Sequence, residues 1–210
     1  MKITVAYLAS YVLSVLGNAV AAIALPLIIL QTTGSVLGAG TVAAATAIPS
    51  VLAGLFMGVL IDRINRRSSS IATDLISGAS VAALPLIDLF TDLSIGLFVV
   101  FGVIGALGDI PGITARETLL PAIVARGALS AERIIGLRES LGAAALVVGP
   151  GAAGLLLALL DGTSVLWVTA GLSFAAAATT LLIPHRAGAV DTAGATPPRQ
   201  SWGALKEGWS

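Results

Sequence analysis

The chain has 210 residues, of which 57% are hydrophobic and only 10% are charged, whereas roughly 25% of the residues of an average soluble domain are charged. Its mean hydropathy of +1.01 indicates an integral membrane protein surrounded by lipid. Basic and acidic residues are equal in number, so the net charge gives no reason to expect nucleic-acid binding. The chain has no cysteine and a single histidine, His185, which excludes disulfides and thiolate sites, and we expect no metal or other cofactor.

The hydropathy pattern predicts six membrane-spanning helices. Each apolar run is long enough to cross a bilayer at 1.5 Å per residue, and short polar or charged stretches separate the runs. The first run is also too long for the core of a signal peptide. The predicted spans are residues 3–30, 36–61, 68–87, 93–113, 141–160 and 165–183.

Polar residues mark the ends of several spans. The hydroxyls of Ser68–Ser70 are expected to cap the third span. Residues 116–138 are interpreted as a polar connection, in which Ser130–Glu132 could begin a short surface helix. His185 is expected to be an interfacial residue at the end of the sixth span.

All basic residues fall on one side of this six-span arrangement, and the other three connections have none. By the positive-inside rule the protein is expected to be a multi-pass protein of the plasma (inner) membrane with both termini in the cytoplasm. The basic residues are Lys2, Arg63, Arg66, Arg67, Arg116, Arg126, Arg133, Arg138, Arg186, Arg199 and Lys206.

The chain is expected to have three parts. Residues 1–185 form the six-span unit, and residues 186–200, which are rich in Ala, Gly, Thr and Pro, form a cytoplasmic linker. In residues 201–210 two tryptophans and a leucine recur at helical spacing, which is typical of an interfacial amphipathic helix. We expect this last part to be the beginning of a helix in a longer protein.

Glycine is frequent at spacings that let membrane helices approach closely, because packing drives association in lipid. These spacings predict a tightly packed bundle. In addition, Pro150 lies deep in the fifth span, where the missing backbone donor is expected to kink the helix. The glycines concerned are Gly54 and Gly58, Gly102 and Gly105, and Gly142, Gly149 and Gly154.

Asp109 is the most informative residue inside a span, because a carboxylate in the bilayer is costly unless it faces a cavity or a partner. Two interpretations remain open: a proton-coupling or substrate-facing role, and a structural pair with Arg116, two helical turns further on. Asn18 lies in the middle of the first span and either joins neighbouring helices by hydrogen bonding or contacts a ligand.

The connection between the second and third spans resembles the signature loop of the major facilitator superfamily, Gly-x-Leu-x-Asp-Arg-x-Gly-Arg-Lys/Arg. Asn65 replaces the second glycine of that pattern, although asparagine also visits left-handed conformations. The matching residues are Gly58, Leu60, Asp62, Arg63, Arg66 and Arg67.

Two further stretches resemble exporters of the same superfamily. Gly149-Pro150-x-x-Ala153-Gly154 is similar to the antiporter motif of drug-efflux members, with Ala153 in place of a glycine. Residues 116–121, Arg-Glu-Thr-Leu-Leu-Pro, resemble the macrolide and siderophore exporter branch.

The resemblance implies an all-α membrane fold in which six helices form two inverted three-helix repeats, half of a twelve-helix transporter. Such proteins move substrate by rocking two halves about a site at the midplane. By this resemblance Asp62 is implied to pair with a helix of the other half and to help hold the outward-facing state, with the neighbouring arginines in a charge relay.

The sequence therefore predicts the N-terminal half of a proton-coupled exporter of small amphipathic compounds, and not an enzyme. Its expected partners are membrane lipids, a small-molecule substrate, protons, and either the missing C-terminal half or a second copy, with no nucleic acid. A half-size transporter that acts as a dimer and a non-transporting membrane scaffold or sensor are the alternatives.

Overall fold

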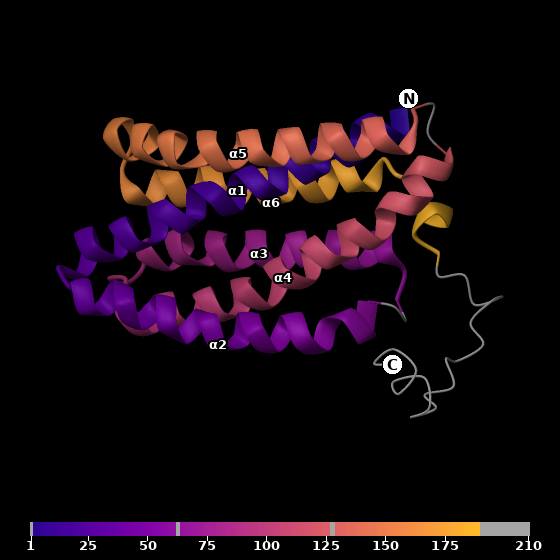
Figure 1. The fold of residues 1–210 in the computed structure, drawn as a ribbon. Helices are drawn as coiled ribbons and strands as arrows, with labels where there is room; N and C mark the ends of the chain where they lie inside the picture. Colours follow the sequence, from indigo (N-terminus) through magenta and orange to yellow (C-terminus); the bar gives the residue numbers. More distant parts are fainter. Residues whose placement is uncertain (1, 62–63, 127–128, 190–210) are drawn as a thin grey trace, which may run out of the picture.

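The computed structural model describes residues 2–61, 64–126 and 129–189, without the side chains of residues 56–61. Within these ranges the regular structure consists of α-helices and one short 3-10 helix (Figure 1). The elements are α1 (Lys2–Thr33), α2 (Val36–Ile61), α3 (Arg66–Asp88), α4 (Ile95–Arg126), α5 (Ala131–Leu159), α6 (Gly162–Leu181) and η1 (His185–Gly188).

The six-helix prediction is confirmed, since six helices of the described chain are long and apolar enough to cross a membrane. The end of α1 is a sharp turn, for which Gly34 adopts a φ of 65°. Glycine has no Cβ and takes up this left-handed conformation without strain.

The predicted polar connection at residues 116–138 is wrong. Helix α4 continues to Arg126, and α5, which spans Ala131–Leu159, begins directly after Ser130. Ser130–Glu132 is therefore the start of a long helix and not a separate surface helix. At 1.5 Å per residue, α4 is longer than the hydrocarbon core is thick, so its charged end can extend beyond the core without breaking the helix.

The prediction that Ser68–Ser70 cap the third span is also wrong. Helix α3 begins earlier, and the side chain of Asn65 accepts hydrogen bonds from the backbone N–H groups of Arg67 (3.1 Å) and Ser68 (3.2 Å). Asn65 has φ −58° and ψ 116°, so it does not use the left-handed conformation that is open to asparagine. Asparagine is favoured at this position because its short side chain satisfies the first orphan donors of a helix.

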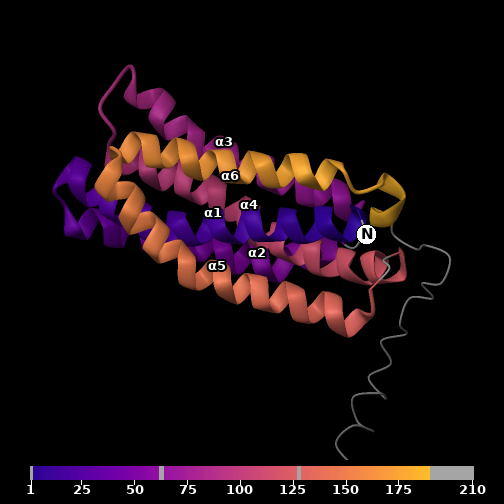
Figure 2. The ribbon, with the colours of Figure 1, turned by 90° about the horizontal axis from the view of Figure 1, so that it is seen from above.

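The helix packing has an internal two-fold pattern (Figure 2). Helix α1 packs against α5 and α6, whereas α4 packs against α2 and α3, and α3 also packs against α6. Exchanging α1 with α4, α2 with α5 and α3 with α6 leaves this set of neighbours unchanged. Because α1 and α4 run in opposite directions along the bundle, the two three-helix units are inverted repeats, as the family resemblance implies.

The two ends of the bundle differ in charge. Lys2, Arg66 and Arg126 lie at the end where α1 and α3 begin and α4 finishes, whereas Asp88 and Asp161 lie at the opposite end. Asp161 caps α6 by accepting a hydrogen bond from the backbone N–H of Ser164 at 2.5 Å, and this bond holds the pKa of the Asp161 carboxyl below its usual range.

Glycines allow several close helix contacts. A methyl group at Gly102 would lie 2.9 Å from a methyl carbon of Thr46, and one at Gly149 would overlap Ala19. By contrast, nothing lies within 4 Å of the equivalent position at Gly154, so the prediction of a close contact is wrong there. Gly58 lies among the residues whose side-chain surroundings are not described.

The bundle continues beyond residue 185, where the linker was expected to begin. The side-chain amide of Asn65 donates to the carbonyl of His185 at 3.1 Å, and Arg126 donates to the carbonyl of Arg186 at 3.2 Å. These bonds fasten η1 to the ends of α3 and α4. The part of the predicted linker from residue 190 onward and the segment 201–210 lie outside the described residues.

Candidate functional site

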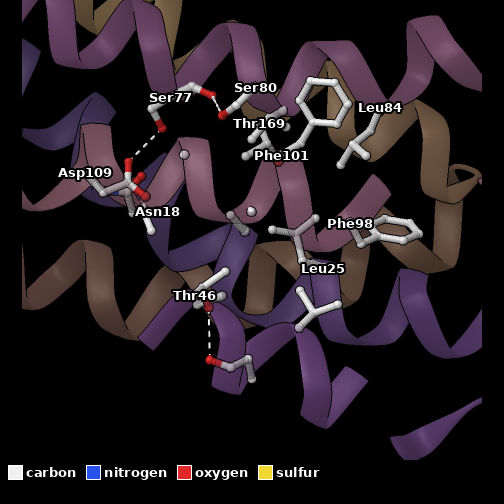
Figure 3. Close-up of a pocket in the computed structure, with 18 of the residues that line it drawn as sticks. Asn18, Leu25, Thr46, Ser77, Ser80, Leu84, Phe98, Phe101, Asp109 and Thr169 are labelled. Carbon is white, nitrogen blue, oxygen red and sulfur yellow. Dashed lines mark hydrogen bonds between the residues drawn. The ribbon is translucent and has the colours of Figure 1, made fainter. Parts of the chain in front are cut away.

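A cavity of about 350 Å³ lies between α1, α2, α3, α4 and α6. This volume is within the range of pockets that hold small molecules. Polar side chains gather at one end of the cavity, where Asp109, Asn18 and Ser77 lie near one another, and Leu84 and Phe98 lie at the other end (Figure 3). The cavity is therefore amphipathic along its length.

Asp109 is placed on this cavity by α4, and its carboxylate has one hydrogen bond from the described chain. The Ser77 hydroxyl donates to Asp109 Oδ1 at 2.7 Å. The side chain is half-buried, so it remains open to the cavity. This placement agrees with a proton-coupling or substrate-facing role.

The alternative prediction, a pair between Asp109 and Arg116, is wrong. The Arg116 guanidinium forms an ion pair with Asp74 of α3, and the exposed fractions of the two side chains are 3% and 5%. Two turns of helix separate Asp109 from Arg116 by roughly 10 Å along the axis, whereas Asp74 faces Arg116 directly across the contact between α3 and α4.

The Asp74–Arg116 pair is held by hydrogen bonds from α1. Ser14 Oγ donates to Asp74 Oδ1 at 3.2 Å, Arg116 Nε donates to Ser10 Oγ at 3.4 Å, and the Tyr7 hydroxyl donates to the Arg116 carbonyl at 3.1 Å. A buried ion pair is tolerated only when further hydrogen bonds satisfy its remaining groups. The network therefore joins α1, α3 and α4 around one compensated charge pair.

The sequence analysis did not identify Asp74 as a partner of Arg116. It is a carboxylate inside a membrane span, which is the same signal that identified Asp109. Asp74 follows Arg67 by only two helical turns, so its place in the sequence does not separate it from the charged end of the helix. In the structure its exposed fraction is 4%.

Asn18 lines the cavity, and its side chain makes no hydrogen bond to the part of the chain that the structure describes. This favours the ligand-facing interpretation over helix–helix bonding. Asn18 also borders a second cavity of about 230 Å³, which lies on the α5 side of α1 and is lined in addition by Tyr11 and Arg116.

The residues of the antiporter-like motif lie outside the main cavity. Gly149 packs against Ala19 of α1, Pro150 lies within α5, and Gly154 has open space around it. Helix α5 contributes no residue to the lining of the 350 Å³ cavity. The motif thus positions α5 against α1 and does not contact the interior of this cavity.

The signature loop is only partly described. Arg66 and Arg67 form the first turn of α3, and Arg67 donates to the carbonyl of Leu181 at 2.8 Å, which ties α3 to the end of α6. Gly58 and Leu60 lie in the last turns of α2, where side chains are not described, and Asp62 and Arg63 lie outside the described residues. The role of Asp62 in holding the outward-facing state stays a prediction.

The chain is similar to known transporters over most of its length. The profile of the Major Facilitator Superfamily matches residues 7–209. The chain is 37% identical over 158 residues to the "Multidrug efflux pump Tap" of Mycolicibacterium fortuitum, an alignment that covers 74% of this chain and 39% of that protein.

It is also 37% identical over 168 residues to the protein of the same name from Mycobacterium tuberculosis (strain ATCC 25618 / H37Rv), with 77% of this chain and 40% of the relative aligned. The chain thus spans about two fifths of the length of these relatives. With its six-helix fold and the extent of the profile match, the chain belongs to the Major Facilitator Superfamily.

Proposed function

We propose that this chain is the N-terminal half of a proton-coupled exporter that moves small amphipathic compounds by alternating access. The observation that carries the proposal is the amphipathic cavity with the Asp109 carboxylate on its wall, inside a bundle of the Major Facilitator Superfamily. Similarity to proteins named multidrug efflux pumps favours export over import. Membership of this superfamily also supports a transporter over an enzyme.

Asp109 is the carboxylate that we assign to proton coupling. It faces the cavity and, among the described residues, accepts one hydrogen bond, from Ser77, so it is able to take up a proton in one orientation of the protein and release it in the other. Asp74 is less suited to this exchange because the Arg116 guanidinium compensates its charge in the buried pair.

The working transporter needs a second six-helix unit, either a C-terminal half or a second copy. Outer side chains of α2 and α5 are apolar and exposed, including Leu37 (81%) and Val147 (79%), and such faces suit lipid or another helical bundle. The concentration of basic residues at one end of the bundle supports a cytoplasmic location for that end and for both termini.

The proposal is tested by measuring accumulation of a panel of fluorescent amphipathic dyes in cells with and without the full-length protein. We expect lower accumulation with the wild-type protein, and loss of this difference for Asp109→Asn at normal membrane levels. The control Asp92→Asn changes an exposed acid at the far end of the bundle and should transport normally. Normal transport by Asp109→Asn would contradict its assigned role.

A second variant tests the predicted role of Asp62 in holding the outward-facing state. Asp62→Asn in the full-length protein is expected to impair export without impairing membrane insertion. The same change in the isolated 210-residue chain should have little effect. If the wild-type protein inserts correctly but changes the accumulation of no dye over a wide panel, a scaffold or sensor is the better explanation.

A further inference from the structure

We infer that an anionic phospholipid binds at the end of the bundle where α4 and α6 finish. Its headgroup phosphate lies among Arg67, Arg126 and Arg186, which we call the η1 cluster, and its acyl chains lie along the end of α6. None of these three residues lines either of the two cavities. The lipid site therefore does not depend on the proposed export function.

The η1 cluster is assembled from three segments that are remote in sequence. The short helix η1 packs against both α3 and α4 (Figure 1). Arg67 of α3 donates to the carbonyl of Leu181 at 2.8 Å, and Arg126 at the end of α4 donates to the carbonyl of Arg186 at 3.2 Å. These two bonds bring the guanidinium groups of Arg67 and Arg126 to η1, which itself carries the exposed Arg186.

The positive charge of the η1 cluster is not compensated within the described part of the chain. Arg67 and Arg126 donate to backbone carbonyls, which carry no net charge, and the cations of the described ion pairs are Arg116 and Arg138. Glu132, in the first turn of α5, is exposed, and α5 packs mainly against α1. Uncompensated basic residues at a membrane surface attract lipids with a net negative charge.

The η1 cluster also lies at the depth of the lipid headgroups. Helix α6 has 20 residues, and at 1.5 Å per residue its length matches the roughly 30 Å of the hydrocarbon core. The end of α6 at Leu181 is therefore close to the boundary of the core, and η1 lies just beyond it. A guanidinium at this depth can donate two parallel hydrogen bonds to a lipid phosphate.

The end of α6 provides an apolar surface beside these arginines. Leu181 and Leu182 are 56% and 71% exposed, and Arg67 is bound to the carbonyl of Leu181. Acyl chains can cover the two leucines while the phosphate contacts the guanidinium groups. A free phosphate would use only the charged part of this surface, so the combination favours a phospholipid.

The inference is tested by titrating the purified full-length protein in detergent with dioleoylphosphatidylglycerol or with dioleoylphosphatidylcholine, and measuring the bound lipid by native mass spectrometry. Millimolar inorganic phosphate is added in a parallel titration. We expect the first phosphatidylglycerol to bind at least about tenfold more tightly than the first phosphatidylcholine, because each arginine near the surface favours the anionic lipid. Inorganic phosphate should not displace it.

Arg186→Gln removes one charge and keeps the backbone carbonyl to which Arg126 donates, so η1 should stay in place. We expect roughly fivefold weaker binding of phosphatidylglycerol, the factor that corresponds to about 1 kcal/mol for one arginine, and unchanged binding of phosphatidylcholine. Arg186→Lys keeps the charge and should bind both lipids as the wild type does. The matched control Arg133→Gln removes an exposed arginine of α5 at the same end of the bundle and should retain wild-type binding.

Equal wild-type affinity for the two lipids would overturn the inference, as would unchanged phosphatidylglycerol binding by Arg186→Gln. An equal loss in Arg133→Gln would also overturn it, because the effect would then belong to the general surface charge and not to the η1 cluster. Displacement of the lipid by inorganic phosphate would show that the acyl chains contribute nothing. Size-exclusion chromatography checks folding, and where Arg186→Gln is unfolded, Arg126→Gln decides by the same criterion.

Discussion

Replacing Asp74 with asparagine removes one charge of the buried pair and leaves the Arg116 guanidinium in the interior of the bundle. The side chains of the pair are 5% and 3% exposed, so the guanidinium is left buried without an opposite charge. Removing one partner from a buried ion pair destabilises a protein by about 3–5 kcal/mol. For a chain of this size, each kcal/mol corresponds to roughly 2–4 °C in Tm, so we expect Tm to fall by roughly 6–20 °C.

The two halves of the pair should not be equivalent. A guanidinium cannot lose its proton, whereas a lone carboxyl can become neutral by taking one up. Arg116→Met should therefore be less destabilising than Asp74→Asn. The double variant Asp74→Asn/Arg116→Met contains neither charge and should regain most of the stability that Asp74→Asn loses, because uncharged replacements of a buried pair are often nearly neutral.

The measurement is thermal unfolding in detergent, followed by the loss of the monodisperse peak in size-exclusion chromatography. Asp92→Asn is the control for removing a carboxylate from the exposed surface. A Tm for Asp74→Asn within about 2 °C of this control would show that Arg116 does not depend on Asp74. A double variant less stable than both single variants would contradict the charge argument.

Two further predictions concern packing and a helix cap. Gly149→Val should destabilise the bundle by about 1–3 kcal/mol, because the added side chain would overlap Ala19. Gly154→Val should change Tm little, because the space around Gly154 is open. Equal effects of the two variants on Tm in the same thermal assay would contradict this prediction. Asn65→Ala should lower stability by about 1–2 kcal/mol through loss of the α3 cap and should speed tryptic cleavage after Arg186, because the bond from Asn65 to His185 is lost. Asn65→Asp keeps the cap acceptor but not this donor, so it should speed cleavage with a smaller change in Tm.

The number and order of the helices could be predicted from the sequence because they depend on local hydropathy. An apolar run of sufficient length must satisfy its backbone groups internally, and in lipid it does so as a helix. The prediction failed at the ends of α4 and α5, where hydropathy and structure disagree. Arg116 was assigned to the polar connection after the fourth span, although its charge is compensated within the bundle by Asp74.

Asp109 could also be identified from the sequence, since a carboxylate in a span needs a cavity or a partner wherever it lies. The choice between the two required tertiary structure. Asp109 and Arg116 lie on the same helix, but Arg116 forms its ion pair with Asp74, which lies close to it across the contact between α3 and α4. The same applies to glycine, because spacing alone did not separate Gly149, which packs on Ala19, from Gly154, which packs on nothing.

The sequence by itself thus determined the membrane class, the six helices, the inverted repeats implied by the family resemblance, and the presence of one acidic residue, Asp109, inside a predicted span. Only the tertiary structure decided which acid is compensated and which faces the cavity. The physical reason is that hydropathy and charge act along the chain, whereas ion pairing and cavity formation depend on distances of a few ångströms between helices remote in sequence.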